Sequence, residues 1–352
     1  NAGRLSKRIY EQMNLARKLA ERDIPIIVSI WSAPDWAIDK NTRPAKGVFL
    51  DKSKINSICE SIVKYLLYLK SKYGIEVELF SFNEPDYGVE VYQTPEDHAY
   101  FINKLGQAFK KNGLNTKLLL GDTGSATTEH NKIVWPAIKD TCMHQYIGAI
   151  AFHTYHGCTD IDLKMWKYSA DAVNVPLMIT EGGTNSAAHR YPQIFLQPWF
   201  QFEEIETYLR ICAICQPSTI MEWQLTADYS VLVGEGLYND KGPLRPTQRF
   251  WNLKQLGYTS VGSFWLPTQT DNSNVICAAA VNLTTNKHSI HVLNKGAKRK
   301  VVIKGLTDKV KQLDVYITNQ QNGMRKVSTL EVKNGELSFD ALEQSFYSLF
   351  NY

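Results

Sequence analysis

The sequence predicts an α/β fold with a parallel sheet and helices outside it, followed by a smaller antiparallel β domain. Short apolar runs rich in β-branched residues alternate with longer helical patterns along residues 1–258, which is typical of repeated strand–helix–strand units. From about residue 259 the pattern changes to short alternating segments separated by turn residues. We therefore predict a large domain over 1–258 and a small β domain over 259–352.

The elements of the large domain are expected in a regular order. An amphipathic helix spans about 4–22, and six strands are predicted at 26–30, 77–82, 117–120, 147–152, 177–180 and 219–223. Apolar residues recur at helical spacing over 53–72, 95–112, 131–145, 162–173, 200–215 and 246–256. A closed barrel of parallel strands has eight strands, and the six predicted here would form most of such a barrel.

The small domain is predicted from alternating apolar and polar residues. The runs lie at 275–283, 288–293, 299–303, 313–318, 328–332 and 345–350. Asn322-Gly323 and Asn334-Gly335 are typical of hairpin turns, because both residues of such a turn adopt positive φ. We expect an antiparallel arrangement with hairpins at these two places.

Composition excludes several classes of protein. The 352 residues are 44% hydrophobic with a net charge of +4, so disorder and a nucleic-acid surface, which needs a basic stripe, are both disfavoured. No run reaches the roughly 18 apolar residues of a membrane span, and the glycine-rich phosphate motifs of nucleotide-binding folds are absent from the sequence. Six cysteines are too widely spaced for a disulfide scaffold and leave the redox compartment open.

Carboxylates and aromatic residues follow several of the predicted strands. Glu84 ends V-E-L-F-S-F-N-E, and Glu181 follows V-P-L-M-I-T. A carboxylate at the carboxyl end of a barrel strand is typical of a catalytic group, and a pair of them suggests glycosidic chemistry. Aromatic side chains beside them suit a sugar, whose apolar ring face stacks while its hydroxyls take polar partners.

Three segments resemble one family of enzymes. Asn83-Glu84-Pro85, with Glu181 three strands later, resembles the retaining clan A (β/α)8 glycoside hydrolases, which carry their glutamates on strands four and seven. Trp31-Ser32-Ala33-Pro34-Asp35-Trp36 is similar to the turn after strand three of glycoside hydrolase family 30. The segment L-R-P-T-Q-R-F-W-N-L at 244–253 is similar to that family's entry into its last barrel helix. The resemblance implies a (β/α)8 TIM barrel with a C-terminal antiparallel β-sandwich.

The resemblance also implies roles for individual residues. Glu84 would be the acid/base and Glu181 the nucleophile of a retaining mechanism that passes through a glycosyl-enzyme ester. No cofactor and no metal is implied. The resemblance also supports Asn83 as a residue that binds the sugar 2-hydroxyl. From their places after the predicted strands, we further expect Tyr155 to hydrogen-bond Glu181 and keep it ionised, and His153 to line the same floor of the substrate site. Three aromatic residues are candidate stacking surfaces for the sugar, namely Trp31, Trp36 and Trp223.

Counting strands back from Glu84 makes 26–30 the third strand of a barrel. We therefore expect the first two strands to come from a preceding segment or a second chain. The resemblance implies a carbohydrate partner and a secreted, periplasmic or lysosomal-type location, while composition and run lengths lead us to expect no nucleic-acid partner and no membrane span. Two alternatives stay open, namely a carbohydrate-binding protein that does not cleave its ligand and a transglycosylase that uses the same two glutamates.

Overall fold

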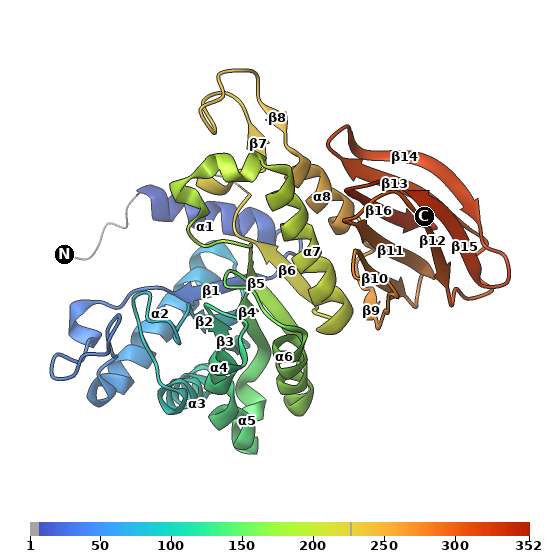
Figure 1. Cartoon of the computed structure of the whole chain (residues 1–352). Helices are drawn as coiled ribbons and strands as arrows, with labels where there is room; N and C mark the ends of the chain where they lie inside the picture. Colours follow the sequence, from blue (N-terminus) through green and yellow to red (C-terminus); the bar gives the residue numbers. More distant parts are fainter. Residues whose placement is uncertain (1–6, 226) are drawn as a thin grey trace. The chain divides into compact units, whose positions relative to one another are not determined.

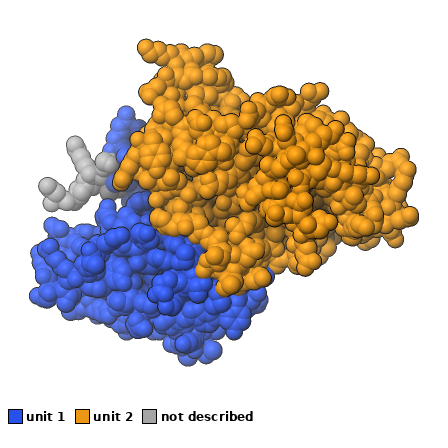
Figure 2. Space-filling view, viewed as in Figure 1, with its two compact units in different colours: residues 1–153, 165–180 blue, residues 154–164, 181–352 orange. Residues whose placement is uncertain are grey.

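The computed structural model describes residues 7–225 and 227–352 (Figure 1). The chain divides into two compact units, which Figure 2 colours separately. The first unit runs to His153 and includes Met165–Thr180, and the second contains Thr154–Lys164 and Glu181–Tyr352.

A six-stranded sheet contains the predicted strands of the large domain. Its order is β1 (Ile26–Ile30), β2 (Val77–Phe82), β3 (Lys117–Thr123), β4 (Ile147–His153), β5 (Leu177–Gly182) and β6 (Thr219–Glu222). β1 pairs with β2, β2 with β3, and β3 with β4, each in parallel. The six predicted strands are confirmed, but β3 and β5 extend past their predicted ends at 120 and 180. Asp122 and Glu181 therefore lie inside strands.

Buried apolar residues on both faces hold the strands of the first unit. Almost every residue of β2 and β3 is buried, including Phe80, Phe82 and Leu118, as expected for parallel strands covered on two sides. Helix α3 (Pro95–Lys111) packs Phe101 and Phe109 against Phe82 and Phe80. The helix therefore fixes the position of β2, whose carboxyl end leads into Glu84.

The helices largely follow the predicted ranges, with one exception. The confirmed ones are α1 (Lys7–Ala20), α2 (Ile55–Tyr73), α3, α6 (Asp160–Val173), α7 (Pro198–Ile214) and α8 (Gln248–Gly257). The predicted helix at 131–145 is instead divided into α4 (Thr128–Asn131), η3 (Lys132–Val134), α5 (Trp135–Lys139) and η4 (Thr141–Tyr146). Asp140 interrupts it with an extended backbone, and its carboxylate accepts a hydrogen bond from the Cys142 N–H in the first turn of η4. Within the described ranges, no helix combines the length and apolar character that a membrane crossing requires.

The C-terminal part of the second unit is an antiparallel β-sandwich. One sheet has the order β14 (Asn322–Glu331), β13 (Gln312–Asn319), β16 (Ser345–Phe350), β11 (Lys287–Asn294), β10 (Val275–Asn282) and β9 (Phe264–Leu266). The other pairs β12 (Arg299–Lys304) with β15 (Glu336–Ala341). Val301, Ile303 and Phe339 of the small sheet pack on a core that includes Val315 and Leu349 of the large one. The antiparallel prediction is confirmed, whereas β9 and β15 were not predicted.

The two Asn-Gly pairs of this domain have different roles. Asn334 and Gly335 form a two-residue turn with φ of 52° and 75°, closed by the Lys333–Glu336 bridge, as predicted. Asn322-Gly323 is not the turn that was expected, because the chain reverses between Asn319 and Asn322. A Cβ atom at Gly323 would lie 2.5 Å from the Trp251 ring. Close packing against α8 therefore explains this glycine.

Candidate active site

The backbone at the end of β2 holds Glu84 in an uncommon conformation. Its φ is 44°, and its N–H donates to the Asp122 carbonyl over 2.9 Å. Asp122 in β3 also has a positive φ, of 56°. The preceding Asn83 is buried, and its N–H donates to the Ile30 carbonyl at the end of β1. Three neighbouring strands thus fix the carboxyl end at which Glu84 stands.

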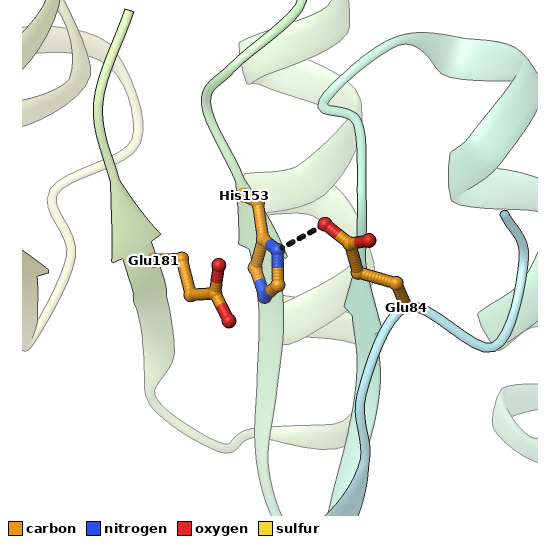
Figure 3. Close-up of side chains that lie close together, drawn as sticks. All are labelled: Glu84, His153 and Glu181. Carbon is orange, nitrogen blue, oxygen red and sulfur yellow. Dashed lines mark hydrogen bonds and ion pairs between the residues drawn. The ribbon is translucent and has the colours of Figure 1, made fainter. Parts of the chain in front are cut away.

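The side chain of Glu84 contacts a buried histidine at the end of β4. His153 Nδ1 lies 3.0 Å from Glu84 Oε1, which is the dashed line in Figure 3, and its Nε2 lies 3.1 Å from Asp122 Oδ1. The His153 ring has no exposed surface. The imidazole is therefore held between two carboxyl groups.

Asp122 is the centre of a buried hydrogen-bond network. Besides His153, its carboxylate accepts hydrogen bonds from the Ser81 hydroxyl at 2.7 Å and the Thr180 hydroxyl at 2.5 Å. Burial raises the pKa of Asp122, but the hydrogen bonds and charge of His153 and the two hydroxyl donors outweigh it, and the net pKa lies below the ordinary value. Asp122 is thus ionised at neutral pH. Asp122 follows the strand predicted at 117–120, but nothing in the sequence indicated this role.

The second unit presents the other predicted carboxylate. Glu181 in β5 is buried, and its Oε2 accepts a hydrogen bond of 2.8 Å from the Tyr155 hydroxyl. A Cβ atom at Gly183 would lie 2.8 Å from the Tyr155 ring, so the glycine makes room for it. Trp223 follows β6, its N–H donates to the Gly182 carbonyl, and its peptide bond to Gln224 is cis.

A loop beside Glu84 contains further polar residues that the sequence did not assign. Asp86 accepts a hydrogen bond from the Gly124 N–H at 3.0 Å and contacts His130 Nδ1. The hydrogen bond that His130 donates to Asp86 raises the pKa of His130 above its ordinary value, although partial burial opposes the shift. Tyr87 stacks on the His130 ring with centroids 5.5 Å apart. A Cβ atom at Gly124 would meet the Glu84 carboxyl group at 3.1 Å.

The structure groups some predicted site residues and leaves others apart. Glu84 and His153 contact each other in the first unit, and Tyr155 contacts Glu181 in the second. Trp31 and Trp36 are 41% and 43% exposed. Their stacking on a sugar, like that of Trp223, stays a prediction.

Glu84, His153 and Glu181 are also a group of described residues whose side chains could each offer one ligand to a metal ion. A metal binds a lone pair of neutral imidazole. Both ring nitrogens of His153 are within hydrogen-bond distance of carboxyl oxygens, so the imidazole already has two partners. We therefore do not identify these residues as metal ligands, and the expectation of a metal-free reaction stays a prediction.

A second buried network, also missed by the sequence analysis, supports the end of β6. The Arg249 guanidinium donates to both Glu204 oxygens and to Glu222 Oε1, and the Tyr208 hydroxyl donates to Glu222 Oε2. Burial and the nearby Glu204 charge raise the pKa of Glu222 well above its ordinary value, and Arg249 offsets only part of this. The network anchors Glu222, which directly precedes Trp223.

Known proteins resemble this chain in fold and not in overall sequence. No protein-family model and no curated protein matches the sequence. Among solved structures, the chain is similar to a family 30 endoxylanase from Clostridium papyrosolvens C71, with a TM-score of 0.79 and 16% identity, covering 98% of this chain and 83% of that one. The fold is similar to that of family 30 glycoside hydrolases.

Two further solved structures share the fold, and the first of them is also a family 30 enzyme. A family 30 subfamily 8 xylanase from Clostridium acetobutylicum has a TM-score of 0.79 and 16% identity over 97% of this chain and 83% of its own. A conserved exported protein from Bacteroides fragilis has a TM-score of 0.68 and 14% identity, and the match covers 94% of this chain and 77% of that one. The predicted TIM-type barrel with a C-terminal β-sandwich is thereby confirmed. Six strands of that barrel lie within the described residues, and the origin of two more strands stays a prediction.

Proposed function

We propose that this protein is a retaining glycoside hydrolase that cleaves β-glycosidic bonds of an oligo- or polysaccharide. The observation that carries the proposal is the placement of two carboxylates at the carboxyl ends of strands in one sheet. Glu84 follows β2 and Glu181 lies in β5. Each has a buried side chain that orients it, His153 for Glu84 and Tyr155 for Glu181.

The two glutamates would act in successive displacements. Glu181 attacks the anomeric carbon and forms a glycosyl ester, while the bond to the leaving oxygen breaks and that oxygen takes the proton of Glu84. In the second step Glu84 removes a proton from water, the water oxygen attacks the anomeric carbon, and the ester electrons return to Glu181. The Tyr155 hydrogen bond suits the nucleophile because it stabilises a carboxylate.

The other residues of the proposal bind the sugar. Asn83 is assigned to the 2-hydroxyl, and Trp31, Trp36 and Trp223 to the ring faces, because aromatic surfaces stack on the apolar faces of sugars. Xylan is the first polysaccharide to test, since two similar structures are xylanases. We further propose an extracytoplasmic location, for which the exported Bacteroides protein is support.

Replacement of the two glutamates tests the proposal. We expect Glu84→Gln and Glu181→Ala to lower hydrolysis in a panel of β-glycans and aryl β-glycosides by at least about 100-fold, since each removes a group that acts in the transition state. Glu129→Gln is the matched control, because that side chain is 75% exposed in the first unit. Losses below about tenfold for both variants would overturn the assignment.

A mechanism-based probe separates hydrolysis from simple sugar binding. A 2-deoxy-2-fluoro glycosyl fluoride should add one glycosyl mass to the peptide that contains Glu181, because the fluorine slows breakdown of the ester. An unchanged peptide mass, with sugar binding retained, would identify a carbohydrate-binding protein. Transfer of the sugar mainly to added sugar acceptors would identify a transglycosylase.

A further inference from the structure

We infer that Asp122 is a positioning residue that keeps one proton on the Glu84–His153 pair. The inference rests on the proposed function, because it concerns the proton that Glu84 delivers. Asp122 does not lie next to Glu84 in the sequence, and its carboxylate reaches Glu84 only through the imidazole. Its backbone reaches the same residue directly, since its carbonyl accepts the Glu84 N–H.

The partners of Asp122 determine which nitrogen of His153 carries hydrogen. Hydroxyl groups of Ser81 and Thr180 donate to the two oxygens of Asp122. An ionised carboxylate can only accept hydrogen bonds, so the 3.1 Å contact with His153 requires hydrogen on Nε2. Asp122 therefore fixes the Nε2–H form of the ring.

The fixed Nε2–H form constrains what lies between His153 and Glu84. If the imidazole is neutral, Nδ1 is an acceptor, and the 3.0 Å contact requires a protonated Glu84. If Glu84 is ionised, the same contact requires a hydrogen on Nδ1 and hence an imidazolium. In both forms one proton lies between Glu84 Oε1 and His153 Nδ1. The pair holds the proton that a general acid must deliver.

The charged groups around the pair favour this proton. The Asp122 carboxylate lies 3.1 Å from His153 Nε2, on the side of the ring away from Nδ1 and Glu84. Negative charge within about 4–6 Å stabilises a proton and raises the pKa of the group that holds it. The loop beside Glu84 adds Asp86, whose charge is matched by His130. Asp122 therefore places its negative charge directly against the His153 ring, across the 3.1 Å contact with Nε2.

Replacement of Asp122 by asparagine tests this role through the pH dependence of activity. The change removes a negative charge but nearly keeps the shape, so the pair should lose its proton at lower pH. We expect the alkaline limb of the kcat/KM profile to move down by roughly one pH unit. Asp171→Asn, at a 60% exposed carboxylate on α6, is the matched control and should leave the profile unchanged.

The leaving group provides a readout that a merely structural role would not change. Phenyl β-glycosides need a proton on the departing oxygen, whereas 2,4-dinitrophenyl β-glycosides do not. We expect Asp122→Asn to lower kcat/KM for the phenyl substrates by about tenfold or more and for the dinitrophenyl substrates by less than about threefold. Equal losses on both, or no loss, would overturn the inference. Full inactivity of Glu181→Ala in the same assays would still support the proposed function.

A measurement on the unaltered protein covers the case in which Asp122→Asn does not fold. Nitrogen-15 NMR of labelled histidine, with the His153 signals assigned by comparison with His153→Gln, reports the hydrogen on each ring nitrogen. We expect hydrogen on Nε2 throughout pH 5 to 8. A neutral ring with hydrogen only on Nδ1 would contradict the inference.

Discussion

The Tyr155 hydroxyl donates a hydrogen bond of 2.8 Å to Glu181 Oε2, and both side chains are buried. A buried hydrogen bond to a charged group contributes about 1.5–3 kcal/mol. We therefore predict that Tyr155→Phe lowers kcat/KM for aryl glycosides by about 10- to 100-fold. Tyr168→Phe, at a side chain that is 60% exposed, is the control and should retain full activity. An undiminished rate in Tyr155→Phe would show that Glu181 does not depend on this contact.

Gly124 leaves room for the carboxyl group of Glu84. A Cβ atom there would lie 3.1 Å from both Cδ and Oε1 of Glu84, so we predict that Gly124→Ala displaces the carboxyl group and lowers kcat at least about tenfold. The melting temperature of Gly124→Ala should differ little from that of the parent protein. Gly257→Ala serves as the comparison, because a Cβ atom at Gly257 meets nothing within 4 Å. Equal kcat values in both variants would contradict the prediction.

The burial of Glu222 beside Glu204 should make stability depend on pH. Because the folded pKa of Glu222 is raised, the folded protein keeps a proton that the unfolded chain releases above about 4.5. The stabilisation is complete below that pH and is lost as pH rises through the folded pKa. We predict that urea denaturation shows this decline in the free energy of unfolding and that Glu222→Gln removes it. An identical pH dependence in the variant would refute the assignment to Glu222.

Two histidines of the first unit should titrate in opposite directions. Asp86 raises the pKa of His130 above 6.5, whereas burial lowers the pKa of His98 to about 4. The Gly121 N–H donates to His98 Nε2, so this ring is held in its neutral form. NMR titration should therefore show His98 uncharged from pH 5 to 8 and the His130 midpoint above 6.5. Asp86→Asn should lower the His130 midpoint and leave His98 unchanged.

Strands and their terminal residues could be predicted from the sequence because they depend on local patterns. Apolar runs located β1 to β6, and short motifs at their ends indicated Glu84 and Glu181. Asp122 could not be found in this way, since its role arises from donors on three other strands that converge on one carboxylate. The Arg249–Glu204 contact joins residues 45 positions apart for the same reason.

Packing also overrode one strong local signal. Asn322-Gly323 has the composition of a hairpin turn, but the glycine lies against Trp251 of α8 and the turn forms two residues earlier. A single sequence does not reveal which distant side chain will require the missing Cβ atom. The Asn334-Gly335 turn, which has no such neighbour from a helix, followed the local rule.

The left-handed backbone of Glu84 bears on how a complex with intact substrate could be prepared. A φ of 44° is unfavourable for glutamate but acceptable for asparagine or glycine. We expect Glu84→Asn to unfold at a higher temperature than the parent protein, by relief of about 1 kcal/mol of strain, whereas Glu84→Gln should gain nothing. Glu84→Asn would then be the better variant for crystallising an unreactive complex with intact substrate. At this position the side chain proposed to deliver the proton is not the one that makes the folded protein most stable.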